Sequence, residues 1–141
     1  MNIINNLVLG SAREQKFIVM TLSDGTTHFC TSPLYIKVGG KTDEVRHKDI
    51  VAKFCKENGF DLKHVLHGAI GIAINRDKVK MEVDGGGLIR TTADSASIYA
   101  GNASGDYGEA PRSVVEHCIR EAMQKEGLEG YRLAVCDVRE S

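Results

Sequence analysis

Apolar and β-branched residues in the first part of the chain come in short runs separated by turn-forming residues. Residues 16–22 and 26–31 form two such runs, and Asp24-Gly25 between them favours the tight turn of an antiparallel hairpin. A third run, 35–38, ends at two consecutive glycines. The pattern therefore predicts a β-hairpin followed by another short strand.

The hydrophobic period then changes to that of an α-helix. We expect Thr42 to be the N-cap, because acidic residues follow it in the first turn, where the helix dipole favours negative charge. Gly59 suits the left-handed position after the last turn. A helix is therefore predicted over 43–58. Its buried face would consist of the apolar residues at helical spacing: Ile50, Val51, Phe54 and Cys55.

A second helix is predicted from Pro111, whose ring suits the first helical turn, to the residues before Gly127. Its expected buried face consists of six apolar residues at helical spacing: Val114, Val115, Cys118, Ile119, Ala122 and Met123. Strands are expected around Ile98-Tyr99 and over 131–138.

The segment between the two helices contains a further hairpin. Alternating residues on both sides of a turn at 75–78 predict two strands within 68–83, and a short helix over 61–67 is a possible preceding element. Asp84 and three glycines then interrupt the chain. Together these elements predict a single domain over 1–141 of the α/β (α+β) class, with one sheet, two main helices and an extra hairpin at 68–83.

Composition narrows the class of partner. Of the 141 residues, 42% are hydrophobic and 26% are charged, as in soluble globular proteins. The 18 basic and 19 acidic residues give a net charge of −1, so we expect neither nucleic-acid nor membrane binding. The first residues lack a signal-peptide pattern, and the four cysteines form no C-x-x-C pair. We therefore expect a cytoplasmic protein with reduced cysteines.

His47 is the first candidate for chemistry. It lies near the start of the first predicted helix, on the same side as Val51 and Phe54. One interpretation is a histidine packed against the core. The other is a nucleophile or general base, since a positive helix N-terminus favours the neutral imidazole. Periodicity alone leaves both open.

Two glycine-rich segments are the next candidates. The loop 101–108 is rich in glycine and precedes the second helix, so it is either an anion-binding nest of backbone N–H groups or a solvated surface loop. Gly85-Gly86-Gly87 suits a bulge or a close backbone approach. His64 and His67 share a helical spacing but lack a third ligand, so no metal site is expected.

With these pieces in order, the chain resembles the janus/ocnus family, the small protein histidine phosphatases. The likeness rests on the strand beginning Lys16-Phe17-Ile18-Val19, on His47-Lys48-Asp49-Ile50 near a helix start, and most specifically on a motif in the second half. This motif runs Gly85-Gly86-Gly87-x-Ile89, Ile98-Tyr99 and Ser104-x-x-Tyr107-Gly108-x-Ala110.

The resemblance implies a mixed sheet of about six strands flanked by two helices. It also implies metal-independent removal of phosphate from phosphohistidine, and in some members phospholysine, on a protein substrate, without a cofactor. His47 would be the catalytic residue, as nucleophile or general base. The backbone amides of Ser104, Gly105 and Asp106 would receive the phosphate, and Lys16 matches a basic residue near it.

The chain departs from the family pattern at charged positions. Leu88 stands where an arginine commonly follows the triple glycine, but Arg90, two residues on, would point to the same face of a strand. Lys37 or Lys41 would replace an arginine expected before the histidine. Asp106 adds a carboxylate to the loop. These differences support an alternative, a non-catalytic phosphate- or phosphoprotein-binding module, and a third reading, a plain interaction domain. The oligomeric state stays open.

Overall fold

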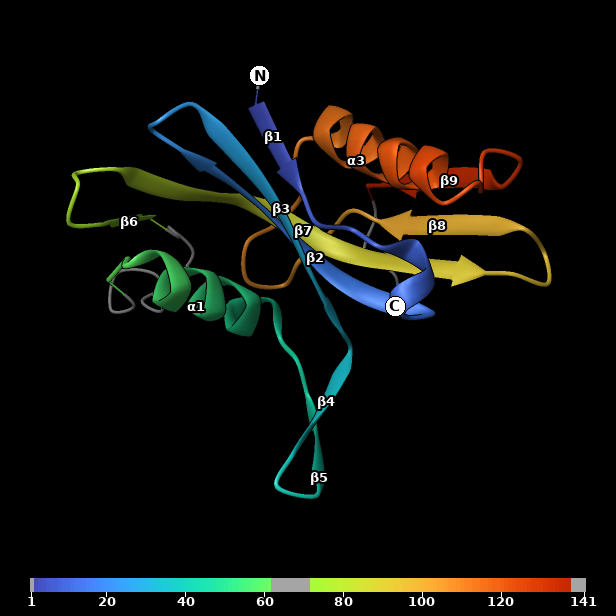
Figure 1. Cartoon of the computed structure of the whole chain (residues 1–141), viewed down its shortest axis with the longest axis horizontal. Coiled ribbons are helices and arrows are strands. Elements are labelled where there is room, and N and C mark those ends of the chain that lie inside the picture. Colours follow the sequence, from blue (N-terminus) through green and yellow to red (C-terminus); the bar gives the residue numbers. More distant parts are fainter. Residues whose placement is uncertain (1, 62–71, 138–141) are drawn as a thin grey trace.

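The computed structural model describes residues 2–61 and 72–137 and contains one mixed sheet with a helix on each face (Figure 1). The strands follow the order β1-β3-β2-β7-β8-β9, and β6 pairs with the start of β7. Pairs β1–β3 and β8–β9 are parallel, and the others are antiparallel. The strand bounds are Asn2–Asn5 (β1), Glu14–Leu22 (β2), Thr26–Pro33 (β3), Ile72–Ile74 (β6), Lys80–Thr92 (β7), Ser97–Gly101 (β8) and Arg132–Cys136 (β9). The predicted fold class is confirmed.

The predicted hairpin is β2–β3. Thr26 donates to the Asp24 carboxylate from its backbone N–H (3.0 Å) and its hydroxyl (2.6 Å). Gly25 has a φ of +94°, in the region that glycine tolerates best. The Asp-Gly turn therefore forms for the physical reason that the sequence suggested.

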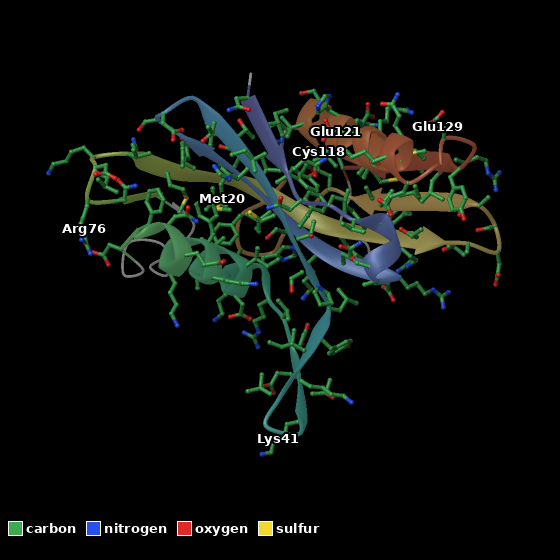
Figure 2. The ribbon with its side chains drawn as sticks, in the orientation of Figure 1. Met20, Lys41, Arg76, Cys118, Glu121 and Glu129 are labelled. Atoms are coloured by element: carbon green, nitrogen blue, oxygen red, sulfur yellow. The ribbon has the colours of Figure 1, made fainter. Side chains whose placement is uncertain are left out.

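Alternation along the strands produces two separate cores. From β2, Phe17 and Val19 pack on the side of α3 (Arg112–Lys125), whereas Ile18 and Met20 pack on the side of α1 (His47–Asn58). Figure 2 shows Met20 on the α1 side and Cys118 on the α3 side. All the apolar residues predicted to face inward from both helices are buried.

The first helix begins later than predicted. Residues Lys41–Glu44 form a strand, β5, that pairs with β4 (Tyr35–Val38) into a two-stranded arm projecting from the body (Figure 1). Gly39 and Gly40 both have positive φ, which suits a tight turn, so the chain folds back instead of entering a helix. Thr42 is therefore not the N-cap. Arg46 is, and its backbone N–H donates to the Asp49 carboxylate (2.8 Å).

Three further parts of the chain differ from the sequence predictions or lie partly outside the described residues. The triple glycine does not interrupt the chain but lies inside β7, where the register with β2 shifts between Val19 and Met20. Strand β1 was not predicted. The expected helix over 61–67, with His64 and His67, falls almost entirely outside the described residues, as does the start of the 68–83 hairpin; its turn at 75–78 and its pairing are confirmed.

A short 3-10 helix, η1 (Leu9–Ser11), connects β1 to β2. Its first two backbone N–H groups donate to the carboxylate of Glu126 at the end of α3, both at 2.8 Å. The link ties the N-terminal segment to the α3 face. No helix within 2–61 or 72–137 is both long and apolar enough to cross a membrane.

Candidate functional site

The middle of β7 has an edge that no described strand covers. On the side away from β2, β6 pairs with Lys80–Glu82 and β8 pairs with Leu88–Thr92. The loop 102–111 lies at the gap between them, where the Gly86 N–H donates to the Gly108 carbonyl (3.2 Å). The triple glycine and the glycine-rich loop, far apart in the sequence, thus form one structural unit.

Each glycine of the triple is required by a close backbone approach. A Cβ at Gly85 would overlap the backbone of Glu109, and one at Gly86 would overlap the Phe17 carbonyl. At Gly87 it would overlap the Gly101 carbonyl. Backbone atoms cannot move aside as flexible side chains do, so any other residue would push the loop, β2 or β8 away.

His47 lies directly over this glycine segment. It is the first residue of α1, half-buried, and its Nε2 is 2.9 Å from the Gly87 carbonyl oxygen. A Cβ built on Gly86 would be 3.2 Å from the ring's Cδ2. The ring and the loop therefore meet at the same residue: the loop hydrogen-bonds the Gly86 N–H, and the ring packs on its open face.

Hydrogen bonds between its own residues close the loop and leave two of its backbone amides without a partner among the described residues. Ser104 and Gly108 exchange backbone hydrogen bonds (3.0 and 2.9 Å), and the Tyr107 N–H donates to the Ser104 hydroxyl (3.2 Å). Ser104 is buried, and its amide is occupied by Gly108. The amides of Gly105 and Asp106 donate to no group among the described residues. Two of the three amides expected to receive phosphate are therefore available.

Asn102 fixes the loop at its base, a role that sequence reasoning missed. Asn102 is 1% exposed. Its side-chain amide donates to the Ala110 carbonyl (2.7 Å) and accepts from the Ala110 N–H (2.9 Å). The same amide also donates to the carboxylate of Asp137 (3.2 Å). A buried amide satisfied on both sides holds the loop ends at a set separation.

Tyr107 connects the loop to α1. Its half-buried side chain packs against the core cluster under α1. Burial, together with the nearby carboxylates of Asp106 and Asp49 and the thiol of Cys55, raises the pKa of the Tyr107 hydroxyl to about 12. The phenol is therefore neutral at physiological pH, and it anchors the loop on the helix that carries His47.

Lys16 lies on the same face of the sheet, since it alternates with Ile18 and Met20. Its ammonium donates to the Val45 carbonyl (2.6 Å) and is 3.4 Å from the Glu44 carboxylate. The lysine thus binds the chain two residues before His47. It places a cation at the helix start, partly neutralised by Glu44.

The other predicted cations are not brought to the glycine segment. Arg90 does point to the α1 side, but its guanidinium pairs with Glu14 (3.6 Å) and lies 5.9 Å from the centre of the Tyr99 ring. Lys37 is exposed on the projecting β4–β5 arm. Sequence reasoning instead missed Arg46, which directly precedes His47.

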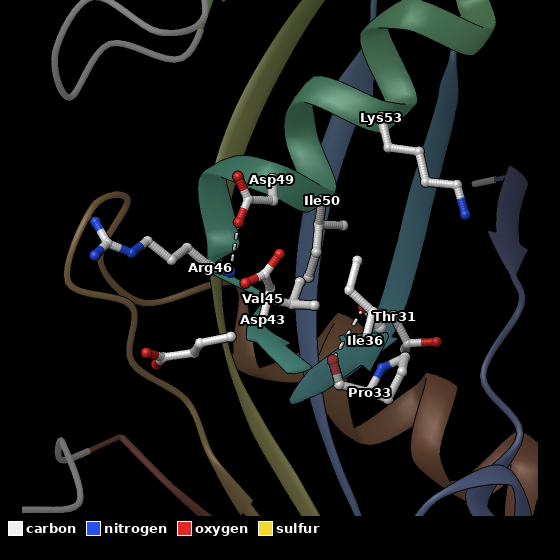
Figure 3. Close-up of a pocket in the computed structure, with 11 residues that line it drawn as sticks. Thr31, Pro33, Ile36, Asp43, Val45, Arg46, Asp49, Ile50 and Lys53 are labelled. Carbon is white, nitrogen blue, oxygen red and sulfur yellow. Dashed lines mark hydrogen bonds between the residues drawn. The ribbon is translucent and has the colours of Figure 1, made fainter. Parts of the chain in front are cut away.

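Arg46 is exposed, and in the described part of the chain its guanidinium forms no ion pair. Figure 3 shows its side chain extending from the start of α1, away from Ile50 and Lys53. Its position beside His47 in the sequence was the signal that could have identified it.

Compared with known proteins, the chain matches no family model, no curated protein and no solved structure. Within 2–61 and 72–137 no three His, Cys, Asp or Glu residues are grouped closely enough to hold a metal ion. The interpretation of the site therefore rests on its own geometry.

Proposed function

We propose that the protein is a phosphatase that removes phosphate from phosphohistidine or phospholysine on proteins, with His47 as the reacting residue. The observation that carries the proposal is the packing of the His47 ring on Gly86, the residue to which the loop with the Gly105 and Asp106 amides is hydrogen-bonded. Transfer of a phosphoryl group requires a reactive nitrogen and anion donors close together, and the contacts at Gly86 bring the ring and the loop to one residue.

The hydrogen bond to Gly87 occupies the Nε2 atom of His47. A carbonyl oxygen only accepts, so Nε2 of His47 is the donor, and a neutral ring then carries its lone pair on Nδ1. As a nucleophile, Nδ1 would form a bond to phosphorus while the P–N bond of the substrate breaks. The electron pair stays on the leaving imidazole, which takes up a proton, and water then hydrolyses phospho-His47. As a general base, Nδ1 would instead remove a proton from the attacking water.

The surrounding groups supply charge stabilisation. The Gly105 and Asp106 amides can donate to phosphoryl oxygens, and the cations of Lys16 and Arg46 flank the residues that lead into His47. Protonated imidazole is a good leaving group, so alignment and neutralisation of the phosphoryl oxygens are the main requirements. No step requires a metal ion, and a chelator is expected to leave the rate unchanged.

The test compares two histidine variants on a phosphohistidine peptide. We expect His47→Ala to lower phosphate release by about 10²–10⁴-fold, as removal of a general base or nucleophile does. The matched control is His117→Ala, an exposed histidine on α3 that lies 3.8 Å from Glu121. Equal rates for both variants would refute the role of His47. Mass spectrometry without acid treatment then distinguishes the routes, since only the nucleophile forms phospho-His47.

A phosphate-binding module without turnover is the second candidate. It is favoured by the engagement of Lys16 with Glu44 and of Arg90 with Glu14, which reduces the positive charge offered to a phosphoryl group. Calorimetry with inorganic phosphate beside the release assay separates the two candidates. Binding without release supports the module, and release at ordinary enzyme rates excludes it.

A further inference from the structure

The β4–β5 arm lies outside the main sheet. Among residues 2–61 and 72–137 its two strands pair only with each other, and every residue of both strands is exposed. Figure 1 shows the arm projecting from the body. A two-stranded hairpin on its own is marginally stable in water, so the arm would gain stability from further strands added at its edge.

Apolar side chains are concentrated on one strand of the arm. In β4, Tyr35, Ile36 and Val38 are 59%, 44% and 56% exposed. The other strand, Lys41–Glu44, is polar and mostly charged. Charges on an edge strand oppose pairing with another chain, whereas exposed apolar residues favour it. The free edge of β4 is therefore the side of the arm that another chain would cover.

The backbone of β4 offers hydrogen bonds at two positions on that edge. The Val45 N–H donates to the Leu34 carbonyl (2.8 Å), so Leu34 directs its carbonyl toward the returning strand. In an antiparallel pair this direction alternates from residue to residue. Tyr35 and Lys37 therefore direct their N–H and C=O groups outward, away from β5.

Two copies of β4 complement each other in one register. With the strands antiparallel and Ile36 on the two-fold axis, Tyr35 of each copy lies opposite Lys37 of the other, and their outward backbone groups meet. Each lysine is then next to an aromatic ring, and Ile36 contacts its own counterpart.

The two neighbouring registers are unfavourable. With Lys37 on the axis, two lysines would lie directly opposite each other, which is destabilising. With Tyr35 on the axis, Lys37 would lie opposite Pro33, which has no N–H to complete the pair. The sequence of β4 is therefore self-complementary only around Ile36.

The charges of the arm also favour a second copy over an anionic partner. Lys37 and Lys41 are balanced by Asp43 and Glu44, so the arm has no net charge that would attract anionic lipid or nucleic acid. Pairing through β4 would leave β5 at both outer edges of the combined sheet. Its charges oppose the addition of further strands, so the assembly closes as a dimer.

We propose that the protein forms a symmetric dimer in which the β4 strands of two copies pair antiparallel around Ile36. The two arms then form one four-stranded sheet in the order β5-β4-β4-β5, stabilised by backbone hydrogen bonds at Tyr35 and Lys37 and by burial of the apolar side chains of β4. This inference does not depend on the proposed phosphatase activity.

The first experiment measures mass by sedimentation velocity under reducing conditions, from about 1 µM to about 1 mM protein. We expect the wild-type protein to change from monomer to dimer over this range. Ile36→Lys places two ammonium groups opposite each other and should raise the dimer Kd by about tenfold or more. The matched control is Ile74→Lys, because Ile74 is 52% exposed on β6, outside the arm. Its Kd should equal that of wild type.

The second experiment tests the register by disulfide formation under mild oxidation. Directly opposite residues of a pair without hydrogen bonds have Cα atoms about 4.5 Å apart, within the range that a disulfide spans. Ile36→Cys should therefore link two copies. Val38→Cys is the control, since its two copies would lie about 13 Å apart along the strands and should not link. The wild-type protein, with its four cysteines, gives the background.

A dimer that Ile36→Lys weakens and that Ile36→Cys links covalently is the expected result. Wild-type protein that stays monomeric at about 1 mM would overturn the proposal. A dimer that Ile36→Lys leaves unchanged would assign the contact to another surface, and equal linking of Ile36→Cys and Val38→Cys would exclude this register. If the protein is instead monomeric and binds vesicles of phosphatidylcholine and phosphatidylserine through the arm, the arm belongs to a membrane surface and the dimer is refuted.

Discussion

The same strands form both faces of the sheet, but the apolar clusters on the two faces differ in extent. Under α3 the apolar cluster is continuous from Leu7 and Leu9 to Val135. Under α1 the cluster includes Met81 and Val83 of β7 but ends at the triple glycine, on which the His47 ring packs. Since glycine contributes no side chain, β7 leaves room for a polar ring and a loop on one face only. Both faces therefore stabilise the fold, and the α1 face also carries the candidate chemistry.

The largest expected effect is on the α3 face. Ile119 is fully buried, and Ile119→Ala should lower the free energy of unfolding by about 2–5 kcal/mol through lost burial and a cavity. Urea unfolding measures this loss. Phosphate affinity of the folded protein should not change, and a parallel loss of affinity would contradict the separation of the two faces.

A smaller loss of stability, but a loss of function, is expected at the glycine segment. Gly86→Ala forces a Cβ against the Phe17 carbonyl and beside the His47 ring, so we expect the free energy of unfolding to fall by about 1–3 kcal/mol and the ring to be displaced. Gly130→Ala is the matched control, because its Cβ would have no neighbour within 4 Å. Phosphate titration of both variants is the measurement, and equal affinities would show that the ring does not depend on Gly86.

The smallest effect concerns Tyr107 and alkaline pH. Its folded-state pKa of about 12 lies above the ordinary value of 10.0, so the unfolded chain loses the phenolic proton first. The contribution to stability is complete below pH 10 and is lost as pH rises from 10 toward 12. Burial also raises the pKa values of the Cys30, Cys55 and Cys118 thiols into this range, so Tyr107→Phe should reduce the slope of stability against pH, which urea unfolding at several pH values would detect. An unchanged slope would place the loop away from α1.

Local patterns were enough to predict much of the fold. The period of Ile50, Val51, Phe54 and Cys55 and that of the α3 stripe gave the correct buried faces, because burial requires that spacing. Thr42 and the acidic residues after it imitate a helix start, and only the Gly39-Gly40 turn and pairing with β4 show that they form a strand. Tertiary pairing overrode a local signal there.

The candidate site was predictable in its residues more than in its contacts. His47 and the loop at 104–108 were identified from a resemblance, and the structure brings both to Gly86. The occupation of the Ser104 amide by Gly108, the clamp of Asn102 on Ala110 and the pairing of Arg90 with Glu14 all depend on how distant backbone segments meet. The spacing of residues in the sequence does not determine these contacts.

The most direct test of the central claim is an NMR titration with inorganic phosphate that follows the backbone amides of Gly105 and Asp106 and the ring nitrogens of His47. If ring and loop form one phosphate site, the signals of both amides and of the His47 ring shift along a single saturation curve, and those of His117 on the opposite face do not move. Amides that stay in place while phosphate is added, or a ring that follows a different curve, would contradict the account.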